Sequence, residues 1–219
     1  MASSFKISFV NDSSNKAGSF CLFQTNSDQS GFGALFSLAW IVSAANTTVD
    51  WVDDLFFYWA NSGVLAPGVT ISLDPNTQGR GTDGRTDNQV TLTELDGTFA
   101  FTNPMAGPQA GTLYLQQDAT IPVNTIAAGI GTSKSPTFMT QGAPNVTLPI
   151  PTTSQVWVIF GDFVQNEVLD LGAISGLPGN EKASPRAGFT QAAQVVFPSG
   201  VKSMVATLNP DNSWTIVPS

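Results

Sequence analysis

Hydrophobic and polar positions alternate over short segments of this chain, a pattern that predicts β-strands rather than helices. In the segment "FKISFV", Phe5, Ile7 and Phe9 fall on one face, while Lys6 and Ser8 fall on the other. Turn residues follow in "NDSSNKAGS", and "FCLFQ" is predicted to be the returning strand of a hairpin. Further short strands are predicted in "GTLYLQ", "TFMTQ", "NVTLPI" and "QVWVIFGDF".

Two further segments have the pattern of β-hairpins. In "NQVTLTELDGTFAFTN", two strands flank Asp96-Gly97, a pair that suits a tight primed turn. The segment "SMVATLNPDNSWTIV" predicts a second hairpin, which turns at residues 209–212. Regular strand spacing with Gly and Pro between strands is typical of a β-sandwich or barrel.

Helical patterns are scarce. The segment "GALFSLAWIVSAA", residues 33–45, could form two or three helical turns, and residues 123–131 and 189–196 are weaker candidates. Residues 174–189 concentrate Gly, Pro and charge, and therefore predict an exposed, mobile loop. The piece that follows is too short to fold alone. We therefore expect an all-β fold: one antiparallel β-sandwich or barrel-like sandwich domain over residues 1–219, with one or two short helices.

Charged residues make up only 11% of the chain, and its formal net charge is −8. Soluble domains usually carry about 25% charged residues. The eight basic residues are scattered, so no nucleic-acid partner is expected, because phosphate binding needs clustered Lys and Arg. Few charges are available to keep strand edges apart, which favours self-association into a homo-oligomer.

The chain contains no histidine and a single cysteine, Cys21. This composition excludes Ser-His and Cys-His nucleophile pairs, an intramolecular disulfide and the usual zinc ligands. No apolar run approaches the length of a membrane span, and "MASSFKISFVND" shows no signal-peptide pattern. We expect a protein without enzymatic activity that is cytoplasmic, or exported without a cleaved N-terminal signal.

The segment "TVDWVDDLFFYWAN", residues 48–61, is both acidic and aromatic. Its two apolar faces favour a core strand entered from a solvated turn. Alternatively, it lines a ligand groove for a glycan or cell-surface ligand, with candidate residues Trp51, Asp53, Asp54 and Trp59. Trp157 and Trp214 are further candidate contacts. A glycosidase pair would need Asp53 close to another carboxylate, such as Asp162 or Glu167, and no local pattern supports it.

A polar segment, residues 73–89, contains hard oxygen ligands of the kind that calcium prefers. The candidate metal ligands are Asp74, Asn76, Asp83 and Asp87. The segment lacks an EF-hand pattern, and Arg80 and Arg85 would repel a cation, so a polar connection between strands is favoured and calcium is the alternative; no other cofactor is expected. The segment "GIGTSK", residues 129–134, is too short and wrongly spaced for a phosphate loop.

The chain contains, in this order, the segments "FVNDSS…FCLFQ", "SLAW", "SGVLAPGV", "NQVTLTELDGTFAFTN", "GPQAGTLYLQQDATIPV", "GIG", "PTFMTQGAPN", "WVIFGDFVQNEVLDL" and "NPDNSWTI". In their order and extent these segments resemble the RhiA family of rhizosphere-expressed bacterial proteins. The resemblance implies a bacterial protein made in quantity near plant roots, without established enzymatic activity or a catalytic residue set. The segments at residues 77–89 and 175–188 match the family pattern least well.

Three functions follow from these observations. The first is a non-enzymatic binding or interaction protein, which recognises glycans or a host surface. The second is a self-assembling structural or inclusion protein. The third, disfavoured by the missing histidine, is a carboxylate-dependent hydrolase.

Overall fold

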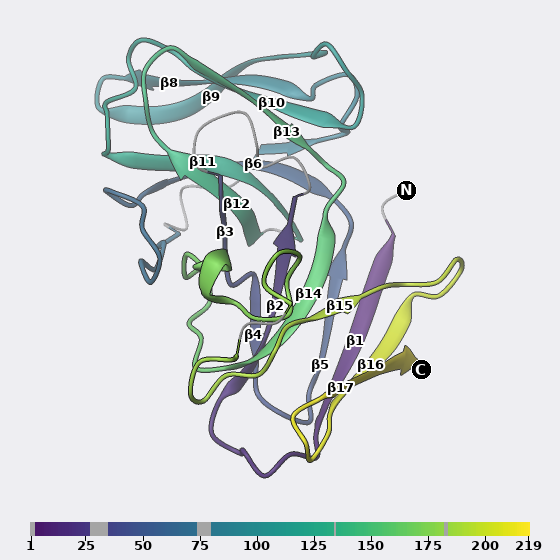
Figure 1. Ribbon diagram of the computed structural model, residues 1–219. Coiled ribbons are helices and arrows are strands. Elements are labelled where there is room, and N and C mark those ends of the chain that lie inside the picture. The colour runs from purple at the N-terminus through teal and green to yellow at the C-terminus, as the bar shows by residue number, and fades with distance from the viewer. Residues whose placement is uncertain (1–2, 27–34, 74–79, 134, 182–183) are drawn as a thin grey trace.

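The structure is a computed structural model that describes residues 3–26, 35–73, 80–133, 135–181 and 184–219. These residues form four β-sheets, which lie in two facing pairs (Figure 1). The helical structure assigned among them is one short 3-10 turn, Leu171–Ala173. The prediction of an all-β, sandwich-like fold is thereby confirmed.

The first sandwich, in the lower part of Figure 1, contains both ends of the described chain. One sheet has the order β17 (Trp214–Pro218), β16 (Ser203–Leu208), β1 (Ser4–Asn11), β5 (Thr48–Val52). The facing sheet has the order β15 (Ala193–Val195), β14 (Gln155–Gly161), β2 (Ser19–Thr25), β4 (Ile41–Ser43). Their inner faces share a core that includes Ile7, Phe9, Phe20, Trp40 and Phe160.

The second sandwich, in the upper part of Figure 1, is built mainly from the middle of the chain. One sheet has the order β3 (Phe36–Ser37), β12 (Ser135–Gln141), β11 (Ile126–Thr132), β6 (Leu55–Asn61), β7 (Arg80–Thr82). The facing sheet has the order β13 (Val146–Pro151), β10 (Thr112–Gln117), β8 (Gln89–Leu95), β9 (Thr98–Met105). Phe57, Leu92, Leu115, Ile130 and Phe138 belong to the core between them.

The sequence pattern predicts where strands lie, but it does not always predict which strands pair. The two hairpins β8–β9 and β16–β17 form as predicted, and Asp96 and Gly97 take the positive φ values, 50° and 77°, that a primed turn requires. The predicted hairpin of β1 with β2 is wrong. Strand β1 pairs with β16 and β5, whereas β2 pairs with β14 and β4 in the facing sheet. Alternation identifies a strand but not its neighbour.

The helix expected over residues 33–45 is wrong over its described part, residues 35–45, which is extended and contains β3 and β4. Three consecutive side chains explain why. Leu38, Ala39 and Trp40 are all fully buried, but each belongs to a different apolar cluster. An extended chain that crosses between the sandwiches can bury all three, whereas a helix would place them around one axis. The weaker helix candidates, residues 123–131 and 189–196, are not helical either: the first contains most of strand β11 and the second contains the short strand β15.

Glycines in β11 serve close packing of the backbone rather than phosphate binding. A Cβ atom on Gly129 would lie 1.9 Å from the carbonyl oxygen of Phe138, and one on Gly131 would lie 2.0 Å from that of Ser135. The register of β11 with β12 shifts between Ile130 and Gly131, which marks a bulge. The first four residues of "GIGTSK" thus belong to strand β11 rather than to a phosphate loop.

Several contacts join the two sandwiches. The side-chain amide of Asn26 donates a hydrogen bond to the carbonyl oxygen of Pro151 at 3.1 Å. Leu38 forms an antiparallel bridge with Val168. A single domain over residues 1–219 stays a prediction, which the cooperativity of unfolding tests. Among the described residues, no helix is long and apolar enough to cross a membrane.

Candidate functional site

The acidic aromatic segment at residues 48–61 is two strands in two sandwiches, not one core strand. Trp51 lies on β5 in the first sandwich, where it is 5% exposed and packs edge-on against Trp40 with ring centroids 5.4 Å apart. Trp59 lies on β6 in the second sandwich and packs against Phe99 at 5.2 Å. The predicted single strand is therefore wrong, and the two indoles do not line one groove. Each indole instead packs in the core of its own sandwich.

The two aspartates between these strands have different surroundings. Asp53 is exposed, and its backbone N–H donates to the carbonyl oxygen of Ser3 at 2.7 Å. Asp54 is half-buried, and its carboxylate accepts a hydrogen bond from the backbone N–H of Ser133 at 2.5 Å. Burial, together with the nearby charge of Asp54, raises the pKa of Tyr58 far above its ordinary value. Asp54 thus has a structural partner.

The other candidate tryptophans also have partners within the protein. The Trp157 indole N–H donates to the Thr25 hydroxyl at 2.9 Å, and Trp157 is buried. The Trp214 indole N–H donates to the carbonyl oxygen of Gln191 at 2.8 Å. Both indoles therefore contribute to the packing of the first sandwich.

Two of the four candidate metal ligands, Asp83 and Asp87, lie in the turn after β7. The Asp83 carboxylate accepts hydrogen bonds from the backbone N–H groups of Arg85 and Thr86 and from the Thr86 hydroxyl. Asp87 accepts from the Thr82 hydroxyl at 2.6 Å and from the N–H of Asp83 at 2.8 Å. The hydrogen bonds that the Asp83 carboxylate accepts, above all the one from the Thr86 hydroxyl, lower the pKa of Asp83 well below its ordinary value.

The other two candidates, Asp74 and Asn76, lie outside the described residues. Across the described ranges, no group of three or more acidic, Cys or His side chains is arranged to hold a metal ion. The polar connection explains Asp83 and Asp87 without calcium, and calcium binding stays a prediction.

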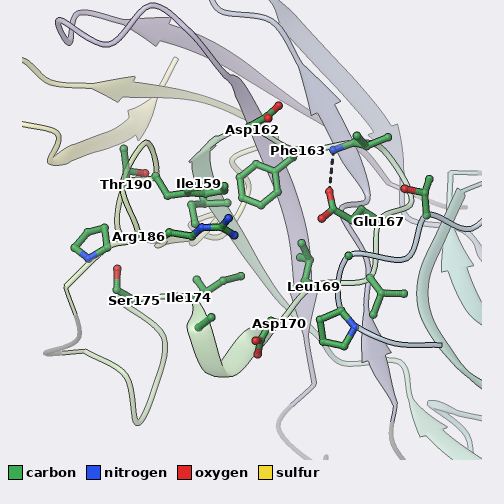
Figure 2. Close-up of a pocket in the computed structure, with 18 residues that line it drawn as sticks. Ile159, Asp162, Phe163, Glu167, Leu169, Asp170, Ile174, Ser175, Arg186 and Thr190 are labelled. Atoms are coloured by element: carbon green, nitrogen blue, oxygen red, sulfur yellow. Dashed lines mark hydrogen bonds between the residues drawn. The ribbon is translucent and has the colours of Figure 1, made fainter.

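A cavity of about 540 Å³ opens on the outer face of the first sandwich, beside β14 (Figure 2). Its residues come from four separate parts of the chain: the loop at 67–70, Ile159 in β14, the segment at 162–175 and the segment at 185–190. The 67–70 loop covers the second sandwich, and Thr70 bridges Glu167. The cavity therefore lies where the two sandwiches meet, a common position for ligand sites.

Apolar groups form one side of this cavity. Ile159, Leu169 and Ile174 line it and belong to the cluster that covers the outer face of β14 and β2. The rings of Phe163 and Phe189 pack edge to face with centroids 5.2 Å apart. The Phe189 ring lies directly over Gly161, where an added Cβ would come within 2.3 Å of the ring. Gly161 at the end of β14 thus makes room for this ring pair.

Polar and charged groups also line the cavity. Asp162, Glu167, Asp170 and Arg186 all line the cavity, and Figure 2 shows the three carboxylates on different sides of it. The Arg186 guanidinium lies 5.4 Å from the centroid of the Phe189 ring. Ser175 is 2% exposed, and its hydroxyl has no hydrogen-bond partner. A buried hydroxyl without a partner is costly in a folded protein, so a ligand or an ordered water that reached this group would gain a hydrogen bond.

Hydrogen bonds of backbone and side-chain groups hold the wall that carries Ser175. The Ser175 carbonyl oxygen accepts from the N–H of Ala192 at 2.8 Å, while the Thr190 hydroxyl accepts from the N–H of Phe160 at 3.1 Å. The Asn180 amide donates to the carbonyl oxygens of Gly172 and Ile174. These bonds fix a segment that has little regular secondary structure of its own.

Sequence reasoning found only part of this site. From the sequence, Asp162 and Glu167 are expected only as possible carboxylate partners of Asp53. In the structure both line the cavity, whereas Asp53 does not. The segment at 174–189, predicted as an exposed loop, contributes Ser175, Arg186 and Phe189 to the walls. Its concentration of Gly, Pro and charge was the available signal, but it did not indicate a cavity.

The fold and the cavity define an all-β protein of two packed sandwiches with a mixed aromatic and polar pocket at their junction. The chain belongs to the RhiA family, whose family model, RhiA, matches residues 2–181. It is 29% identical over 192 residues to Protein RhiA of Rhizobium leguminosarum bv. viciae, covering 84% of this chain and 75% of that protein. No solved structure matches. The family resemblance is confirmed, and the cavity wall at 185–190 lies beyond the residues matched by the family model.

Proposed function

We propose that this RhiA-family protein is a non-enzymatic binding protein that holds a small polar ligand, in the first place the end of a glycan, in the Phe163–Phe189 cavity. The observation that carries the proposal is the buried, unpartnered Ser175 hydroxyl in the wall of a cavity that also contains an aromatic pair. Ligand pockets usually combine an apolar lining with a few polar groups that fix orientation.

The size and lining of the cavity suit a sugar ring. Its volume, about 540 Å³, lies within the range of small-molecule sites. A pyranose has an apolar C–H face and a rim of hydroxyl groups, which can use the rings of Phe163 and Phe189 and the oxygens of Asp162 and Ser175, respectively. The rhizosphere setting implied by the family likeness makes plant and bacterial glycans the first ligands to test.

The chemistry of the chain supports binding without turnover. No histidine occurs in the sequence, so the commonest proton shuttle is missing. One oxygen of Glu167 already accepts a hydrogen bond from the N–H of Val164 at 3.1 Å, as Figure 2 shows. Two carboxylates, Asp162 and Glu167, nevertheless line the same cavity, so hydrolysis of a bound glycan is the competing outcome.

A glycan array followed by calorimetry with the best ligand tests the proposal. We expect binding by the wild type, a loss of about tenfold or more for Ser175→Val, and no change for Ser4→Val, an exposed serine on β1. Circular dichroism checks that both variants fold. Absence of binding across the array would overturn the proposal, and release of products would replace it with the hydrolase.

Self-assembly is the second candidate, and the strand edges favour it. The edge strands β9 and β17 contain no charged residue, whereas soluble proteins commonly protect such edges with Lys or other charges. Light scattering at high protein concentration tests it. Growth of the scattering mass with concentration would support assembly, and a constant monomer mass would exclude it.

A further inference from the structure

The cavity at the junction of the sandwiches carries more negative than positive charge. Three carboxylates, from Asp162, Glu167 and Asp170, line it, against one guanidinium, from Arg186. We infer that the ligand is an amine-bearing sugar, and that the cavity selects a protonated amino sugar over its neutral or acidic counterparts. This inference rests on the proposed function, and it specifies the class of ligand.

The three carboxylates keep oxygens that are free to accept from a ligand. Glu167 uses Oε2 for the N–H of Val164, and Asp170 uses Oδ1 for the N–H of Gly172 at 3.1 Å. Asp162 is exposed, and its carboxylate makes no hydrogen bond within the described part of the chain. Each carboxylate can therefore accept at least one further hydrogen bond, and Asp162 can accept several.

The positive charge in the cavity does not neutralise these carboxylates. In the ranges that the structure describes, none of the three lies within 4.0 Å of a Lys or Arg nitrogen. The Arg186 guanidinium instead lies over the Phe189 ring. An ammonium group that enters the cavity would therefore gain charge-assisted hydrogen bonds that no group of the protein now makes.

The spread of the carboxylates favours an organic cation over a metal ion. A metal site needs several ligands within bonding distance of one point, and no such group of three occurs among the described residues. Figure 2 shows the carboxylates on different sides of the cavity. A sugar that carries one ammonium and several hydroxyls matches acceptors that are distributed in this way.

Ser175 provides an independent indication of a polar ligand. Its hydroxyl is buried, lacks a partner and lies on the Arg186 side of the cavity (Figure 2). The Phe163–Phe189 pair offers apolar surface for the C–H face of the same sugar. A ligand that used only the carboxylates would leave both features unexplained, whereas an amino sugar uses all of them.

The net charge of the chain, −8, adds to this selection. A negatively charged sugar approaches a negative protein and a negative cavity, so its association is disfavoured. Arg186 is the one group in the cavity that would favour such a ligand, and the comparison with an acidic sugar tests its influence directly.

Calorimetry with four monosaccharides tests the inference at about pH 6, where a primary amine carries its charge. The probes are glucosamine, glucose, N-acetylglucosamine and glucuronic acid. We expect glucosamine to bind about tenfold or more tighter than glucose, N-acetylglucosamine to bind as weakly as glucose, and glucuronic acid to bind most weakly. Added salt should weaken glucosamine binding more than glucose binding.

Two matched variants locate the effect. Asp162→Asn should remove most of the preference for glucosamine while glucose binding changes little, because the amide keeps its size but loses its charge. Asp12→Asn, an exposed carboxylate outside the cavity, should leave the preference unchanged. Circular dichroism and the thermal midpoint confirm folding of both variants.

The outcomes separate this inference from the proposed function. Equal binding of glucose and glucosamine, or tighter binding of glucuronic acid, would overturn the inference and leave a glycan-binding protein. If glucosamine retained its preference in Asp162→Asn, recognition of the amine by Asp162 would be wrong. If neither the monosaccharides nor an array of larger glycans bound, the proposed function would fall, and the inference with it.

Discussion

The carboxylate of Asp54 accepts a hydrogen bond from the backbone N–H of Ser133 at 2.5 Å. The Ser133 hydroxyl in turn accepts from the backbone N–H of Val52 at 3.3 Å. Val52 ends β5 of the first sandwich, and Ser133 lies in the turn between β11 and β12 of the second. These two bonds therefore tie the sandwiches together at the point where the chain passes from one to the other.

Replacing Asp54 by alanine should destabilise the protein by about 1–3 kcal/mol, because the N–H of Ser133 loses its acceptor. Asp53→Ala is the matched control. Asp53 is exposed, and its side chain makes no described hydrogen bond, so its loss should change stability by less than about 0.5 kcal/mol. Urea unfolding measures both values. Equal effects of the two substitutions would show that the Asp54–Ser133 bond contributes little.

Trp51→Ala should lower the free energy of unfolding by about 3–5 kcal/mol, the usual range for removing a buried aromatic side chain. Trp51 is buried between Trp40, Phe5 and Phe197 in the first core. Urea unfolding measures the change, and a conservative Trp51→Phe variant should recover part of it. A small loss of stability with a large loss of ligand binding would instead support the predicted ligand contact.

The turn after β7 should stabilise the protein less at low pH. The pKa of Asp83 in the folded state lies below its ordinary value of 3.8, so the ionised carboxylate is favoured by folding. Its contribution is fully present above the unfolded-state pKa and is lost as the pH falls below that value toward the folded-state pKa.

Stability measured between neutral pH and about pH 2 tests this contribution of Asp83, with the unfolded carboxyl titrating near pH 4. Asp83→Asn should flatten the acid limb of the curve of stability against pH. Glu94→Gln is the control and should leave the acid limb in place, because the Glu94 carboxylate accepts no hydrogen bond in the described part of the chain. An unchanged acid limb in Asp83→Asn would contradict the assignment.

Leu38→Ala should destabilise both sandwiches in a single transition. Leu38 is fully buried in the cluster beneath the 62–73 segment and bridges Val168, so a loss of about 2–5 kcal/mol is expected. Tryptophan fluorescence and far-ultraviolet circular dichroism should report coincident urea transitions before and after the substitution. Two separated transitions would mean that the sandwiches unfold as independent domains.

Gly161→Ala should displace the Phe189 ring and reduce glycan binding by about tenfold or more. A Cβ atom at Gly161 would come within 2.3 Å of that ring. Gly81→Ala is the control, because its Cβ would meet the Phe56 ring at an ordinary 3.4 Å and lies outside the cavity. Calorimetry with the best glycan ligand compares the two. Unaltered binding by a folded Gly161→Ala variant would exclude a role for the position of the Phe189 ring.

The sequence by itself determined the class of fold and several of its parts. Alternation at Phe5, Ile7 and Phe9 predicted β1, and Asp96-Gly97 predicted the β8–β9 turn. These are local properties, because side-chain alternation and turn geometry depend on a few neighbouring residues. The missing histidine is also independent of folding, and it limits the chemistry that the chain can perform.

Only the tertiary structure decided which strands pair and where side chains are buried. Trp51 and Trp59 share one acidic aromatic segment, yet they pack in different sandwiches. The cavity likewise brings Thr70, Asp162, Ser175 and Phe189 together from distant parts of the chain. The physical reason is that strand pairing and core packing are long-range contacts, and alternation marks a buried face without specifying what covers it.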